Sequence, residues 1–175
     1  MTGSESTGKT TLATELAAHF RTLWTPEFAR GYAEARGGFL TALDVEPIAR
    51  GQMAVEDAAF AIARTAVFHD TDLLSTWVYA GHYYGLRPEW LARLVAERRA
   101  DLYLLADVDL PWQADGVRDR PAERSDLDRL FRDALEKFGC RYEVVRGTRR
   151  ARLESALEAI GRSGLVSEGG RAAGL

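Results

Sequence analysis

The sequence predicts an α/β fold in which a parallel sheet is covered by helices on both faces. Short apolar runs typical of buried strands alternate with longer stretches whose apolar residues recur at helical spacing. Strands separated by helices pair in parallel, because the crossover helix returns the chain to the same edge of the sheet. The runs expected as strands are residues 23–25, 66–68, 102–105 and 142–145.

Each helical stretch carries an apolar stripe, and most have a residue that favours a helix start or stop. Leu12, Leu16 and Phe20 form the stripe of a helix that begins near Lys9. Further helices are expected over residues 44–64, 73–84 and 88–98, then from a cap at Ser125 to a stop at Gly139, and last from a cap at Thr148.

The composition is that of a globular domain and excludes several classes of partner. A length of 175 residues suits one domain, expected over residues 1–162, with a Gly- and Ala-rich disordered tail over 163–175. The formal net charge of -3 argues against a nucleic-acid partner. No apolar run approaches the roughly 18 residues of a membrane span. A single cysteine, Cys140, excludes an intrachain disulfide and is compatible with the cytoplasm.

A phosphate-binding motif stands at the start of the chain, where residues 3–10 read GSESTGKT. Its glycines let successive backbone N–H groups point at phosphate oxygens, and the following helix adds its positive end. Lys9 is expected on the β- and γ-phosphates and the Thr10 hydroxyl on Mg²⁺. The motif predicts a P-loop NTPase fold with ATP and Mg²⁺ as cofactors. The expected nucleotide-binding residues are Gly3, Ser4, Glu5, Ser6, Thr7, Gly8, Lys9, Thr10 and Thr11.

A P-loop follows a buried strand, yet only Met1 and Thr2 precede Gly3. We therefore expect the first strand of the fold to be missing from this chain. We expect the genomic reading frame to extend upstream of Met1 and to encode about five to eight apolar, β-branched residues there.

Acidic residues follow two of the expected strands. Asp70 and Asp72 are two residues apart, so an extended chain would point both carboxylates at the carboxyl edge of the sheet. One carboxylate would then hold Mg²⁺ through water and the other would contact a substrate hydroxyl. The alternative is a solvated turn in which Asp72 caps a helix. Glu27 and Arg30 follow the strand at 23–25 and form either an acceptor site or an exposed i,i+3 pair.

Arginines gather in the polar segment that precedes Ser125. Arg118, and after it Arg120 and Arg124, are candidates for a mobile loop that stabilises the charge of a transferred phosphoryl group. Trp112 is a candidate for stacking on a base. The alternative is a solvated loop with local Asp–Arg pairs.

Four segments together resemble a known family. They are Gly3–Leu12, Pro26-Glu27-Phe28-Ala29-Arg30, Asp70-Thr71-Asp72, and Pro111-Trp112 through Asp115-Gly116-Val117-Arg118. In this order and spacing they resemble the ribosylnicotinamide kinase domain of the bifunctional bacterial NAD-biosynthesis protein and related P-loop ATPases. The resemblance covers residues 3 to about 160, and its last two segments are more specific than the P-loop alone.

The resemblance implies a kinase that transfers the γ-phosphate of ATP to the 5′-hydroxyl of a nucleoside such as nicotinamide riboside. It implies catalytic roles for Lys9, Asp70, Glu27 and Arg118, a metal site at Thr10 and Asp70, and substrate contacts from five further residues. These are Arg30, Asp72, Trp112, Arg120 and Arg124.

The sequence offers two candidate bases and two candidate functions. Either Asp70 or Glu27 can act as the base. Where the family encloses the nicotinamide ring with aromatic residues, the sequence places Pro26 and Val55, which predicts weak use of nicotinamide riboside. The rival interpretation is a nucleotide-dependent ATPase switch with a protein partner.

Overall fold

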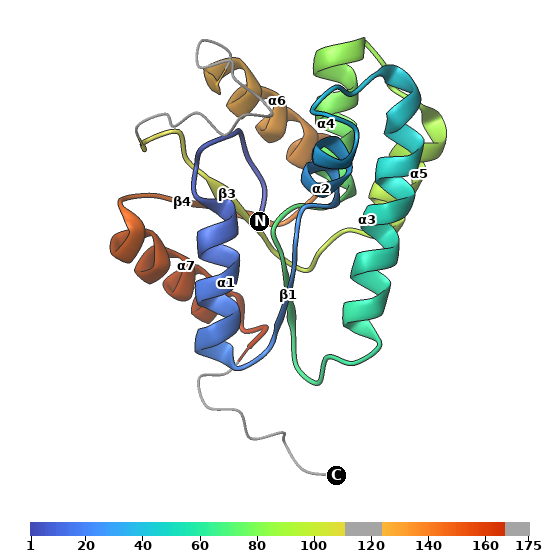
Figure 1. Ribbon diagram of the computed structural model, residues 1–175. Helices are drawn as coiled ribbons and strands as arrows, with labels where there is room; N and C mark the ends of the chain where they lie inside the picture. Colours follow the sequence, from blue (N-terminus) through green and yellow to red (C-terminus); the bar gives the residue numbers. More distant parts are fainter. Residues whose placement is uncertain (111–123, 167–175) are drawn as a thin grey trace.

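The computed structural model describes residues 1–110 and 124–166, in which strands and helices alternate along the chain (Figure 1). The strands are β1 (Leu23–Thr25), β2 (Val67–His69), β3 (Tyr103–Ala106) and β4 (Tyr142–Val145). The helices are α1 (Lys9–Phe20), α2 (Phe28–Ala35), α3 (Val45–Phe60), α4 (Leu73–Tyr84), α5 (Glu89–Glu97), α6 (Arg124–Lys137) and α7 (Arg149–Ser163), with a 3-10 turn η1 (Ala42–Asp44).

The sheet is parallel and consists of two halves. β1 pairs with β2, and β3 pairs with β4. Between the halves lie the first residues of the chain, where Thr2 forms a single parallel bridge with Leu105 of β3. On the other side, the amine of Met1 donates a hydrogen bond to the carbonyl of His69 in β2. Residues 1–3 therefore occupy the centre of the sheet, where one bridge and one hydrogen bond connect them to the strands on either side.

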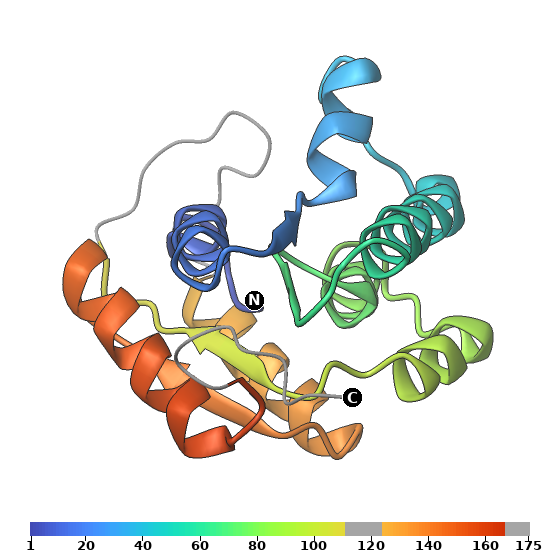
Figure 2. The ribbon, with the colours of Figure 1, turned by 90° about the horizontal axis from the view of Figure 1, so that it is seen from below.

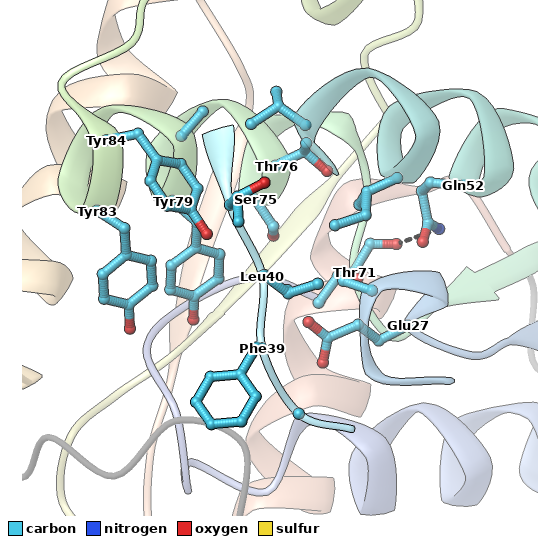
Figure 3. A pocket seen from close by; sticks show the side chains of 16 residues that line it. Glu27, Phe39, Leu40, Gln52, Thr71, Ser75, Thr76, Tyr79, Tyr83 and Tyr84 are labelled. Carbon is cyan, nitrogen blue, oxygen red and sulfur yellow. Dashed lines mark hydrogen bonds between the residues drawn. The ribbon is translucent and has the colours of Figure 1, made fainter. Parts of the chain in front are cut away.

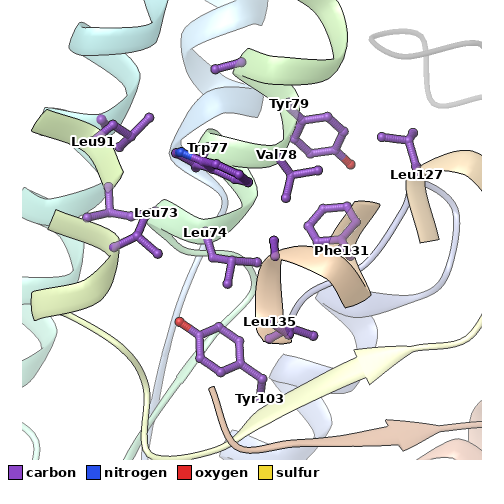
Figure 4. Close-up of a cluster of buried hydrophobic side chains, with 14 of the residues drawn as sticks. Leu73, Leu74, Trp77, Val78, Tyr79, Leu91, Tyr103, Leu127, Phe131 and Leu135 are labelled. Carbon is purple, nitrogen blue, oxygen red and sulfur yellow. The ribbon is translucent and has the colours of Figure 1, made fainter. Parts of the chain in front are cut away.

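Helices cover both faces of this sheet. On one face α1 and α7 pack on β2, β3 and β4 through a cluster that includes Leu12, Leu16 and Ile160 (Figure 2). On the other face α3, α4, α5 and α6 enclose the larger cluster, in which Leu74, Phe131 and their neighbours are buried (Figure 4). The predicted fold class, a parallel sheet covered on both faces, is confirmed.

Individual boundaries differ from the sequence prediction in a few places. Helix α3 ends at Phe60 rather than at residue 64, and α2 was not predicted as a separate helix. Ser125 is no cap, because α6 already begins at Arg124 and places Ser125 inside its first turn. Thr148 does stand at the N-cap of α7, but its side chain makes no capping hydrogen bond there.

The expected tail is described only in its first residues. Ser163 is the last residue of α7, and Val166 packs against the cluster on that face. The rest of the tail, residues 167–175, lies outside the described residues. Throughout residues 1–110 and 124–166, no helix combines the length and the apolar character needed to cross a membrane.

Candidate nucleotide and acceptor site

Residues 3–8 form a tight loop at the carboxyl edge of the sheet, between the bridge at Thr2 and the start of α1. Gly3 has φ 126°, and a Cβ there would lie 3.0 Å from the carbonyl oxygen of Ala106. Gly8 has φ 76° and is the N-cap residue of α1. Ser6 adopts φ 53°, which is uncommon outside glycine and often accompanies functional loops. This backbone suits an anion at a helix N-terminus.

The loop is held by its own side chains. Thr7 donates from Oγ1 to the carbonyl oxygen of Ser4 at 2.8 Å. Lys9, 9% exposed, donates from Nζ to the same carbonyl oxygen at 2.6 Å. The lysine ammonium thus lies over the loop, where the sequence places the phosphates, while Thr11 is exposed in the first turn of α1.

Thr10 and Asp70, the predicted metal pair, are brought together. The Thr10 hydroxyl donates to Oδ2 of Asp70 at 2.6 Å. Burial raises the pKa of Asp70 and the nearby Glu27 carboxylate adds to this, while Thr10 and Lys9 act in the opposite direction. A hydroxyl and a carboxylate are hard oxygen donors of the kind Mg²⁺ accepts when phosphates and water complete its shell. Within the described residues, no three His, Cys, Asp or Glu side chains could hold a metal by themselves.

Glu27 and Arg30 lie at the start of α2. Glu27 is the N-cap residue of α2, is 9% exposed and lines a pocket. Arg30 lies 3.8 Å from its carboxylate and has a side chain that is 41% exposed. The i,i+3 pair is therefore present, but it is one-sided, because the carboxylate is buried and faces a pocket while the guanidinium is open to solvent.

Asp72 does not face the nucleotide loop or this pocket. Its Oδ1 accepts a hydrogen bond from the backbone of Leu74 at 3.1 Å, as an N-cap of α4, and its Oδ2 accepts one from the Tyr103 hydroxyl at 2.5 Å. Burial raises the pKa of Asp72, and burial together with Asp72 raises that of Tyr103. The geometry favours the helix-cap interpretation of Asp72 over a substrate contact.

Two buried arginines support the loop from behind. Arg124 donates to the carbonyl oxygens of Leu110, at 3.0 Å, and Ser6, at 3.5 Å. Arg152, 2% exposed, donates to the carbonyl oxygen of Thr7 at 2.7 Å. The other predicted residues of the arginine segment, Trp112, Arg118 and Arg120, lie outside the described residues.

A pocket of about 320 Å³ opens beside the loop, between α2, α3 and α4 (Figure 3). Its polar wall holds Glu27, Gln52 and hydroxyls of Thr71, Ser75 and Thr76. Its apolar wall carries four aromatic rings, those of Phe39, Tyr79, Tyr83 and Tyr84. A pocket with one aromatic wall and a few convergent polar groups suits a small molecule that has a ring and hydroxyls.

Pro26 and Val55, where the sequence placed the base, do not line this pocket. The aromatic wall of the pocket comes instead from Phe39 and from the tyrosines of α4. Sequence reasoning also missed Gln52, which is 1% exposed. It accepts a hydrogen bond from the backbone of Phe28 at 3.0 Å and donates one to the carbonyl of Thr71 at 3.0 Å, fixing two pocket segments to α3.

Comparison with known proteins agrees with this geometry. A family model described as an AAA domain matches residues 1–152. The chain belongs to this AAA domain family. The chain is 34% identical over 149 residues to the trifunctional NAD biosynthesis/regulator protein NadR of Escherichia coli K12. This match covers 82% of the chain and 36% of the relative. The NadR of Salmonella typhimurium LT2 is 37% identical over 120 residues, covering 66% of the chain and 29% of the relative.

Solved structures of NadR share the fold of this AAA domain. A NadR structure in complex with NR has a TM-score of 0.81 at 24% identity, covering 97% of this chain and 51% of that one. A NadR structure in complex with NAD and AMP-PNP has a TM-score of 0.76 at 24% identity, covering 94% and 48%. The 34% identity to NadR over 82% of the chain confirms the resemblance to the NAD-biosynthesis family, and the chain spans about a third of the length of these curated relatives.

Proposed function

We propose that the chain is an ATP-dependent kinase that phosphorylates the 5′-hydroxyl of a nucleoside, with nicotinamide riboside as the first candidate. One observation carries this proposal: a pocket with a buried carboxylate, Glu27, is joined to the phosphate-binding loop, because its lining residue Tyr83 donates a hydrogen bond to Glu5. A hydrolytic switch needs only water next to its nucleotide, whereas a kinase needs a second pocket for its acceptor.

Each side chain at the junction has a distinct task in this proposal. The loop N–H groups and Lys9 bind the phosphates and stabilise the charge that spreads over the transferred group. Thr10 and Asp70 would hold Mg²⁺, which neutralises phosphate charge when bound. Because Asp70 already bonds to Thr10 and Glu27 faces the pocket, we assign the acceptor hydroxyl to Glu27. Glu27 accepts the proton of that hydroxyl, and Arg118 stays the first candidate to support the phosphoryl group.

The aromatic wall supports a nucleoside acceptor. The rings of Tyr79 and Tyr83 are parallel within 4° with centroids 5.7 Å apart, and Phe39 is 83% exposed at the mouth of the pocket. A cationic pyridinium ring gains roughly 0.5–2 kcal/mol on an aromatic face. This wall supports use of nicotinamide riboside, whereas Pro26 and Val55 predict weak use. The relatives support the same acceptor, since one NadR structure is a complex with NR and another contains AMP-PNP.

The test is a panel of nucleosides, with nicotinamide riboside and uridine side by side, assayed for ATP-dependent phosphorylation. Nicotinamide riboside should raise ADP formation well above basal hydrolysis. Glu27→Gln should lower kcat by at least ~100-fold, as for a lost general base, whereas Glu34→Gln on the exposed side of α2 should leave it unchanged. If no nucleoside stimulates ATP turnover, the kinase proposal fails and the nucleotide switch with a protein partner replaces it.

A further inference from the structure

A hydrogen bond joins the acceptor pocket to the phosphate-binding loop. The hydroxyl of Tyr83, in the last turn of α4, donates to Oε1 of Glu5 at 2.7 Å. Glu5 is 3% exposed and stands at a position of the loop motif that the motif leaves variable. The two residues are 78 apart in sequence. A buried carboxylate is costly in a loop that binds polyanions, so its partner matters to the shape of that loop.

The tyrosine end of this bond is anchored in the protein core. The Tyr83 ring stacks on that of Tyr79, and Tyr79 in turn packs edge-on against Phe131 of α6, with centroids 5.6 Å apart. Figure 3 shows the two tyrosine rings side by side with their hydroxyls pointing the same way, and Figure 4 shows Tyr79 beside Phe131. Tyr79 and Phe131 are buried, so this support is rigid.

We propose that Tyr83 is a positioning residue that sets the phosphate-binding loop, through Glu5, at the correct place relative to the acceptor pocket. The inference rests on the proposed kinase function. The Tyr83 ring is part of the wall of the acceptor pocket, and its hydroxyl is bonded to Glu5 of the loop. Its bond to Glu5 therefore fixes the distance between the acceptor and the phosphate to be transferred.

This role predicts a separation between kcat and KM. Removing the hydroxyl leaves the ring in the pocket wall, so the acceptor still binds. It frees the loop at Glu5, and small errors in the placement of reacting groups lower the rate of the chemical step. Tyr83→Phe should therefore lower kcat about 10-fold, the effect of one lost hydrogen bond to a charged group, and change the acceptor KM by less than about 2-fold.

The experiment is a double-mutant cycle between the two ends of the bond, measured as kcat and KM for the nucleoside that the wild-type chain phosphorylates. Glu5→Ala should lower kcat at least as much as Tyr83→Phe, and the double variant should be no slower than Glu5→Ala alone, because both changes remove the same hydrogen bond. Glu5→Gln keeps an oxygen that accepts from the tyrosine and should retain most of the rate. Tyr142→Phe in β4, away from the loop and the pocket, is the matched control.

The outcomes separate this inference from the proposed function. A wild-type chain that phosphorylates no nucleoside overturns the proposed function and the inference with it. An active wild type overturns the inference alone if Tyr83→Phe retains full kcat, if the two single effects multiply in the double variant, or if KM rises while kcat stays unchanged. Should Tyr83→Phe fail to fold, Glu5→Ala and Glu5→Gln test the same bond from the loop side.

Discussion

At the scale of single residues, the site combines side chains that local patterns reveal with others that they do not. Lys9, Thr10 and Asp70 are found from sequence because each belongs to a short motif whose geometry is local. Tyr83 and Arg152 are not, because each acts on the loop from a helix 78 or 145 residues further along the chain. No spacing rule connects such positions, so only the packed fold reveals them.

Asp72 shows the same limit from the other side. Its sequence neighbourhood favours a strand-end ligand, with a helix cap as the alternative. What favours the cap is the hydroxyl of Tyr103, which approaches the carboxylate from β3, 31 residues away. Local pattern thus found the carboxylate, and a distant element decided its orientation.

Lys9 gives the sharpest prediction at this scale. Lys9→Ala should lower phosphoryl transfer by at least ~100-fold, because a positive charge aimed at the transferred phosphate is lost. The melting temperature should change little, since Lys9 contacts the loop carbonyl of Ser4 rather than the core. Steady-state kinetics with a thermal melt measures both. Retained turnover would remove Lys9 from the mechanism.

At the scale of elements, β2 and α3 each bury an ionisable side chain, His69 and Glu56, and burial shifts the pKa of both. Burial lowers the pKa of His69 to about 4, so its neutral ring pairs with the Thr25 hydroxyl across β1 and β2 at 2.7 Å. On α3, burial and the charge of Asp72 raise the pKa of Glu56 to about 7. Arg98 lies 3.5 Å from the Glu56 carboxylate and offsets only part of this effect.

The raised pKa of Glu56 predicts how stability depends on pH. Because the folded pKa exceeds the ordinary value of 4.5, ionisation of Glu56 costs stability, and the cost grows from pH 4.5 to pH 7 and is complete above it. A shift of this size corresponds to about 3 kcal/mol. Glu56→Gln should therefore melt several degrees above the wild type at pH 8 and close to it at pH 4.5.

The matched control for that measurement is Glu46→Gln, on the exposed side of the same helix and paired with Arg50. It should not raise the melting temperature at pH 8, because Glu46 is 56% exposed and the substitution also removes its ion pair. A constant difference for Glu56→Gln would mean that Glu56 titrates normally.

At the scale of the whole molecule, the centre of the sheet is held by Met1 and Thr2, which link the two strand pairs. β2 and β3 face each other across a groove of about 530 Å³, lined in part by Phe68, Leu102, Leu104 and Ile160. Met1 also lines this groove. Alternation of strands and helices was enough to predict the sheet and its direction, since these depend on local periodicity. The shape of the groove depends on how α7 packs against β3, and the spacing of apolar residues along the sequence does not reveal that packing.

A strand added ahead of Met1 should fill this groove. An extension of about six apolar, β-branched residues should raise the melting temperature by several degrees, a shift typical of a ~1–2 kcal/mol gain, because it pairs backbone groups of β2 and β3. A Gly/Ser extension of equal length is the control and should have no effect. Equal melting temperatures for both extensions would show that the groove does not accept a strand.

The bridge at Thr2 also affects how easily the two halves of the sheet separate. It is one residue away from Gly3, so the phosphate-binding loop lies on the seam between the two half-sheets. We expect amide hydrogens along this seam to exchange with solvent sooner than those inside each half, because few hydrogen bonds hold it closed. In the proposed function, a nucleotide on the loop whose Mg²⁺ is held by Asp70 at the end of β2 would contact both sides of the seam, as a cross-link does. Nucleotide binding should therefore slow this exchange and stiffen the whole sheet.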